Sequence, residues 1–171
     1  MKPIALLMLA AGLAGPAWAG KAHEHGAARL DVALDGGTLT LALQTPLDGL
    51  LGFERAPRNA AEQRQADAAI ATLRAADRLF AIDPAARCQL ASVVLTSAPL
   101  KLGDAPPRPQ DGHADLDGEF VFRCASAPGW IDAGLFRAFP RLARIDVQVA
   151  APKGQRKLVL KRPAQRLELP R

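Results

Sequence analysis

His23 and His25 are the residues whose type and spacing best suit metal chemistry in this chain. They stand two positions apart in the run His-Glu-His-Gly. Residues i and i+2 of an extended segment face the same way, so both imidazoles could reach one ion. Imidazole suits zinc, copper and nickel. His23 and His25 occupy odd positions, as do the polar residues Arg29 and Asp31 of the first hairpin strand. If that strand began before the histidines, both imidazoles would point away from the core. The alternative is a solvated terminus without metal.

A second group repeats this spacing further along the chain. His113, Asp115, Asp117 and Glu119 alternate with small or apolar residues, which puts four potential ligands on one face of an extended segment. Zinc usually takes four ligands drawn from cysteine, histidine and carboxylate. Two ligands from each group would complete a site. The alternative is two solvated polar faces that bind no metal.

Motifs that would indicate an enzyme are absent from the sequence. None of its three serines lies in a G-x-S-x-G context, and the H-E-x-x-H, P-loop and G-x-G-x-x-G patterns do not occur. We therefore expect no catalysis. The chain has a formal net charge of +5, and basic residues are in excess over 153–171. That segment, however, has no aromatic side chain on which nucleic-acid bases could stack. It is typical of a solvated strand rather than of a nucleic-acid-binding surface.

Residues 1–19 have the pattern of a secretory signal peptide. Lys2 precedes an apolar run over 4–14, and Ala-Trp-Ala at 17–19 provides small residues for cleavage after Ala19. The run is too short to span a bilayer, for which about 20 apolar residues are needed. We expect a periplasmic protein of residues 20–171 without membrane insertion. A cut after Gly20 would instead make His23 the third residue, where copper or nickel could bind in square-planar geometry.

The two cysteines, Cys88 and Cys124, are expected to form one disulfide in an oxidising compartment. The alternative is a pair of metal thiolates, but no C-x-x-C spacing is present.

The pattern of apolar residues predicts a single α+β domain with an antiparallel β-sheet and one main α-helix. Alternation on both sides of Gly36-Gly37 indicates a hairpin over 28–45. Asn59 and Glu62 resemble a capping box that opens a helix over 60–79. Further strands are expected at 88–96, 117–124 and, as a final antiparallel pair, from 145 onward, with a short helix near 133–139. A proline-rich surface loop is expected over 97–112.

Several segments in the same order resemble the ZrgA-type periplasmic zinc-uptake proteins. They are His-Glu-His-Gly at 23–26, the hairpin ending in Thr45-Pro46, Gly-Phe-Glu-Arg-Ala-Pro at 52–57, Ala-Arg-Cys at 86–88, His-Ala-Asp at 113–115, Phe-Arg-Cys at 122–124, and 136–140 ahead of Ile-Asp-Val-Gln at 145–148. The resemblance implies zinc binding through His23, His25, His113 and Asp115. It also implies a periplasmic zinc-binding protein or a zinc ABC importer as partner.

The chain departs from that family pattern at two places. Residues 106–112 hold no histidine where the family commonly has a histidine- and acid-rich run, which argues against the gathering of several ions. Arg55 stands where the family tends to have histidine, and arginine cannot act as a ligand at ordinary pH. We interpret 52–57 as structural, with Phe53 packing beneath the start of the helix.

Two functions follow from these patterns. The first is a periplasmic zinc-binding protein that captures or buffers zinc for an importer. The second is a metal-free envelope interaction module, in which the loop 97–112 contacts another protein.

Overall fold

The computed structural model describes residues 26–104 and 114–170, so the predicted signal peptide lies outside the described residues. The strands are β1 (Ala27–Asp35), β2 (Thr38–Pro46), β3 (Phe80–Ile82), β4 (Gln89–Thr96), β5 (Asp115–Arg123), β6 (Trp130–Ala133), β7 (Arg144–Ala151), β8 (Gly154–Lys161) and β9 (Arg166–Glu168). The helices are α1 (Leu47–Leu51), α2 (Ala60–Arg74), α3 (Ala76–Leu79) and α4 (Leu135–Ala138), and Pro84–Ala86 forms a 3-10 turn. The predicted α+β class is confirmed.

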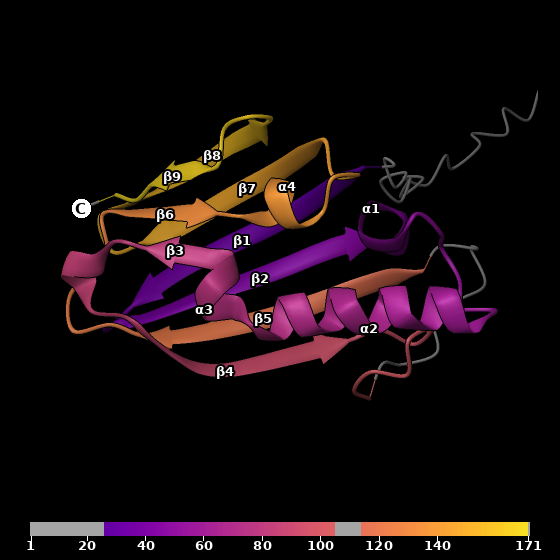
Figure 1. The fold of residues 1–171 in the computed structure, drawn as a ribbon. Coiled ribbons are helices and arrows are strands. Elements are labelled where there is room, and N and C mark those ends of the chain that lie inside the picture. The colour runs from indigo at the N-terminus through magenta and orange to yellow at the C-terminus, as the bar shows by residue number, and fades with distance from the viewer. Residues whose placement is uncertain (1–25, 105–113, 171) are drawn as a thin grey trace, which may run out of the picture.

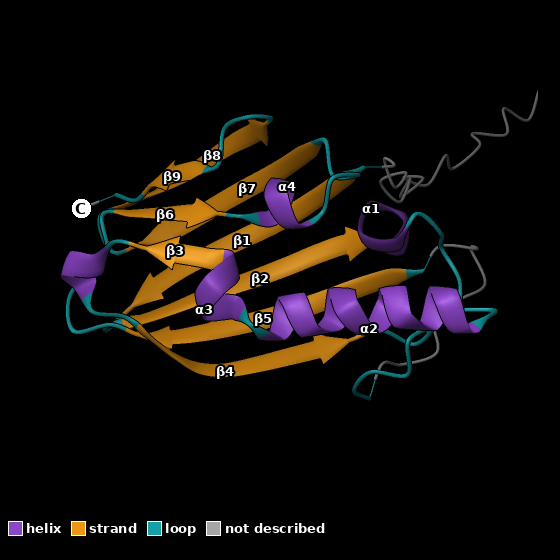
Figure 2. Ribbon diagram, in the orientation of Figure 1, coloured by secondary structure: helices purple, strands orange, loops and turns teal. Residues whose placement is uncertain are grey.

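Two sheets form the framework. The larger has the strand order β4-β5-β2-β1-β7-β8 and the smaller has the order β3-β6-β9. Figure 1 shows α2, α3, α4 and the smaller sheet on one side of the larger sheet, with α1 at the end of β2, and Figure 2 shows the same layering by element type. Phe80 of β3 meets Phe120 of β5 across this interface, with ring centroids 5.2 Å apart. The core therefore lies between the larger sheet and the layer of helices and short strands.

The predicted hairpin is confirmed, with β1 and β2 pairing from Arg29–Gln44 to Asp35–Thr38. Its apolar side chains alternate with polar ones, and the apolar set is buried. The predicted final antiparallel pair is also confirmed as β7 and β8. The larger sheet is nevertheless mixed, because β1 pairs in parallel with β7. A parallel pair needs a long crossover connection, and the chain between β2 and β7 provides one.

The predicted helix over 60–79 is broken at Ala75, whose ψ of 51° is not helical. Asn59 caps its start as expected, because its side chain accepts a hydrogen bond from the Glu62 N–H at 2.9 Å. The break lets α3 turn so that Leu79 is buried and Phe80 leaves the helix as the first residue of β3. The sequence also did not predict the smaller sheet, whose strands are three or four residues long.

Candidate metal-binding edge

Three strand ends meet at one edge of the larger sheet. β1 begins at Ala27, β2 ends at Pro46, and β5 begins at Asp115, which is the register partner of Pro46. Neighbouring strands lie about 4.8 Å apart, so β1 and β5, with β2 between them, are about 10 Å apart. We call this edge, together with helix α1 that follows Pro46, the ligand edge (Figure 1).

The three histidines themselves, His23, His25 and His113, lie outside the described residues. The residues that directly follow two of them are described, and hydrogen bonds hold both. Gly26, next to His25, accepts hydrogen bonds on its carbonyl from the N–H groups of residues 143 and 144, at 2.8 and 3.2 Å. Ala114, next to His113, accepts one from the N–H of Leu47 at 2.8 Å. The chain therefore enters the described fold at the ligand edge from both predicted ligand groups.

Gly26 changes one inference about the first histidine pair. Its φ of 73° is in the left-handed region that favours glycine. Regular strand alternation therefore stops at Ala27. The parity of Arg29 and Asp31 cannot be carried back through Gly26, so the expectation that the His23 and His25 side chains continue the outer face of β1 has no support.

The acidic group on β5 has the alternation that the sequence predicts. Asp115, Asp117 and Glu119 share the outer face of the strand, whereas Leu116 and Phe120 are buried against the core. A strand rises about 3.3 Å per residue, so Asp115 and Glu119 are about 13 Å apart along β5. Zinc–oxygen bonds are about 2.0–2.2 Å long, so one ion cannot bind both ends of the row.

Burial distinguishes the members of this acidic row. One carboxylate oxygen of Asp115 and one of Asp117 are buried, whereas Glu119 is exposed. Among residues 26–104 and 114–170, no group of three histidine, cysteine or acidic side chains is arranged to hold a metal ion. The described carboxylates therefore do not form a complete site by themselves.

Two further carboxylates stand out once the fold is known. Asp48 in α1 and Glu54 shortly after it each have one buried carboxylate oxygen, like Asp115 and Asp117. Sequence reasoning gave no ground for choosing them, because the contact between α1 and the start of β5 joins segments that are far apart in the chain. The one available signal is the position of Asp48, three residues after the predicted hairpin 28–45.

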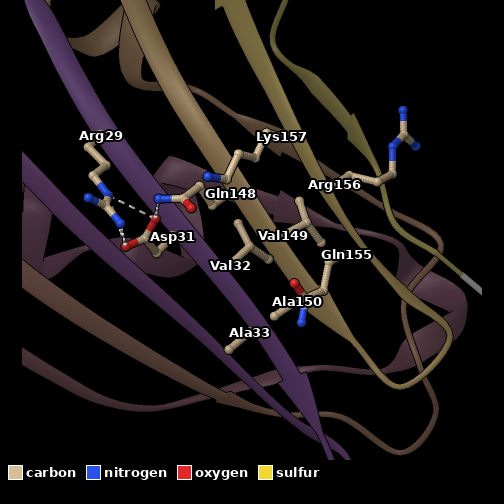
Figure 3. A pocket seen from close by; sticks show the side chains of 10 residues that line it. All are labelled: Arg29, Asp31, Val32, Ala33, Gln148, Val149, Ala150, Gln155, Arg156 and Lys157. Carbon is tan, nitrogen blue, oxygen red and sulfur yellow. Dashed lines mark hydrogen bonds and ion pairs between the residues drawn. The ribbon is translucent and has the colours of Figure 1, made fainter.

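The outer face of the larger sheet carries two hollows, and the one over β1, β2, β4 and β5 is lined by Asp117 and Glu119 of the acidic row. One, of about 300 Å³, lies over β1, β7 and β8, and the other, of about 490 Å³, lies over β1, β2, β4 and β5. Both are lined by Asp31, which accepts hydrogen bonds from Arg29 at 3.1 Å and Gln148 at 3.2 Å (Figure 3). The Asp31 carboxylate is therefore already engaged by a guanidinium and an amide group, which disfavours metal binding by this residue.

Arg55, at the position where the family pattern has histidine, has a structural role. Its guanidinium donates two hydrogen bonds to Glu62, at 2.6 and 2.9 Å, and lies 4.8 Å from the ring centroid of Phe53. These bonds, followed by one from the Arg58 N–H, lower the pKa of Glu62 to about 2. Phe53 is partly buried against the core. The segment 52–57 thus anchors the start of α2.

The predicted disulfide is confirmed, with Cys88 and Cys124 bonded at 2.05 Å. The bridge joins the residue before β4 to the residue after β5, at the far end of β5 from Asp115. The sulfur atoms are therefore not available as metal thiolates.

Comparison with known proteins assigns the chain to a family. A family model described as ZrgA family zinc uptake protein matches residues 22–169. The matched range includes all three histidines and both cysteines. No curated protein matches significantly. Within the described part of the chain, no helix is both long and apolar enough to cross a membrane.

Proposed function

The chain belongs to the ZrgA family of zinc uptake proteins, and from this premise we propose that it captures zinc in the periplasm at the ligand edge and makes it available to an importer. One observation carries the location. β1 begins two residues after His25, β5 begins two residues after His113, and only β2 separates the two strands. No step of this function requires catalysis.

We propose His23, His25 and His113 as imidazole ligands, with Asp115 as the carboxylate. Three imidazoles and one carboxylate meet the tetrahedral preference of zinc. Asp117 is the next carboxylate along the row, and Glu119 is too far from Asp115 to share the ion. This set mixes ligands from both predicted groups, and it uses the end of the acidic row where carboxylate oxygens are buried.

The periplasmic location rests on the signal-like pattern of residues 1–19 and on the disulfide, which suits an oxidising compartment. A partner would be a periplasmic zinc-binding protein or a zinc ABC importer. Two roles, delivery to the importer and buffering of free zinc, need the same reversible binding.

Calorimetric titration of zinc into residues 20–171 tests the site. We expect saturable binding to the wild type and a loss of about tenfold or more in affinity for the His23→Ala/His25→Ala double variant and for His113→Ala, because removing even an outer partner of a metal ligand costs 10–100-fold. Glu119→Ala is the matched control, since Glu119 lies on the same strand face but beyond reach. Absence of saturable heat in the wild type refutes the proposal.

Thermal melting separates this function from a metal-free interaction module. A ligand that binds only the folded state raises the melting temperature. Zinc should do so, and the comparison with copper and nickel tests whether His23 binds those ions near a new amino terminus instead. If all three metals leave the melting temperature unchanged, an interaction module that uses the loop 97–112 becomes the better explanation.

A further inference from the structure

A short loop links the anchors of both predicted histidine groups. Residues 139–143, which we call the brace loop, connect α4 to β7. The N–H of Ala143 donates to the Gly26 carbonyl at 2.8 Å, and the N–H of Arg144, the first residue of β7, donates to the same carbonyl at 3.2 Å. The brace loop therefore holds the residue next to His25.

The same loop packs closely on helix α1. A Cβ atom on Gly49 would lie 2.7 Å from Cδ2 of Leu142, and one on Gly52 would lie 2.7 Å from Nε of Arg141. A side chain at Gly49 would push Leu142 aside, and Gly52 also has a φ of 79°, which favours glycine. The first N–H of α1 in turn donates to the carbonyl of Ala114, next to His113. One loop thus connects the two sides of the ligand edge.

Arg162, directly after β8, holds the brace loop in place. Its Nε donates to the carbonyl of Leu142 at 3.1 Å, and its Nη2 donates to the carbonyls of Pro140 at 2.7 Å and Phe139 at 3.3 Å. Its guanidinium also lies 5.3 Å from the ring centroid of Phe136 in α4. The planar guanidinium places its donors on separate nitrogens in a fixed geometry that reaches all three carbonyls, whereas the three donors of a lysine share one nitrogen on a flexible stem.

We propose that Arg162 is a positioning residue for zinc binding, acting through the brace loop on Gly26 and α1. Metal ligands bind tightly when the groups that carry them are held in place before the ion arrives. Without Arg162, three loop carbonyls lose a common donor, and the brace loop that bonds to Gly26 and packs on α1 is free to shift. The inference rests on the proposed function, because its effect is a change in zinc affinity.

The test compares Arg162→Gln with Arg166→Gln. Arg166 is a matched control, since it also stacks on an aromatic ring, that of Trp130 at 3.9 Å, and also donates paired hydrogen bonds, to Asp132 at 2.7 and 2.8 Å. Those contacts lie in the smaller sheet and do not touch the brace loop. Both variants should lower the melting temperature, but only Arg162→Gln should weaken zinc binding, by about tenfold.

Two readouts keep the outcomes separate. Hydrogen exchange at the amides of Leu47, Ala143 and Arg144 should accelerate in Arg162→Gln and stay unchanged in Arg166→Gln. If Arg162→Gln does not fold, Arg162→Lys, which keeps the charge but loses the fork, must show the same direction of loss. Equal zinc affinity in the wild type and the Arg162 variant overturns the inference, as does an equal loss in Arg166→Gln. A wild type that binds no zinc overturns the proposed function.

Discussion

Removing the disulfide should separate the stability of the fold from the chemistry of the ligand edge. The bridge between Cys88 and Cys124 closes a loop with a sequence separation of 36. In the chain-entropy treatment, a loop of this length constrains the unfolded chain by about 4 kcal/mol at 25 °C. The Cys88→Ala/Cys124→Ala variant should lose about that free energy of unfolding. For a protein of this size the melting temperature should fall by roughly 8–16 °C.

The native fold should survive this change, because other bonds hold the same place. The N–H of Cys124 donates to the Gly37 carbonyl at 2.7 Å, and the N–H of Ala125 donates to the Ala86 carbonyl at 2.9 Å. β4 and β5 also remain paired from Gln89–Arg123 to Thr96–Asp117. The loss should therefore come from greater freedom of the unfolded chain rather than from a rearranged sheet.

Urea unfolding of the variant is the assay, with the reduced wild type as the matched comparison. Both should show a similar loss of unfolding free energy. Zinc affinity should stay unchanged, because nine residues of extended chain separate Cys124 from Asp115 by about 30 Å. A loss below about 1 kcal/mol would refute the entropic argument. A fall in zinc affinity would refute the independence of the two ends of β5.

Three other measurements test the electrostatics and backbone of the same fold. Bonding to Arg55 lowers the pKa of Glu62 from 4.5 to about 2, so the contribution of this ion pair to stability is complete above pH 4.5 and is lost as the pH falls toward 2. The Glu62→Gln variant should therefore show a flatter pH dependence of the urea midpoint between pH 4.5 and about pH 2. Gly37→Ala should destabilise more than Gly36→Ala, since both have positive φ but only at Gly37 would a Cβ lie 2.9 Å from a backbone oxygen, that of Cys124; equal losses in chemical denaturation would contradict this. Zinc affinity, measured by calorimetry, should fall as pH drops through about 6.5, because imidazole must be neutral to bind; an affinity that is flat between pH 7.5 and pH 5.5, roughly one unit either side of that value, would exclude histidine ligands.

Local patterns predicted the elements whose residues interact with near neighbours. The hairpin was predictable because Leu30, Val32 and Leu34 alternate with polar residues up to a Gly-Gly turn, and the alternation depends on strand geometry alone. The cap at Asn59 was predictable because its bond to Glu62 spans three residues. The disulfide was predictable from two cysteines in a chain that carries a signal-like pattern over residues 1–19.

Long-range pairing accounts for most of what the sequence did not predict. Nothing in the alternation of β7 indicates that it lies parallel to β1 rather than antiparallel to another strand, because a half-buried strand has the same period in both arrangements. The three-residue strands β3 and β9 are too short for any period to be visible. Their positions depend on packing against the larger sheet, as the contact between Phe80 and Phe120 illustrates.

The hydrogen bonds and close contacts that hold the ligand edge are also long-range, so the histidine pattern alone does not predict them. Ligands on connecting segments must be ordered when they bind, and that ordering opposes binding. A rigid anchor next to each segment reduces the cost. Gly26 and Gly52 have positive φ, and a Cβ on Gly49 would lie 2.7 Å from Cδ2 of Leu142 in the brace loop. The glycines next to the histidine motif therefore indicate where the backbone is held by the fold, whereas the histidines indicate only that a metal ion could bind.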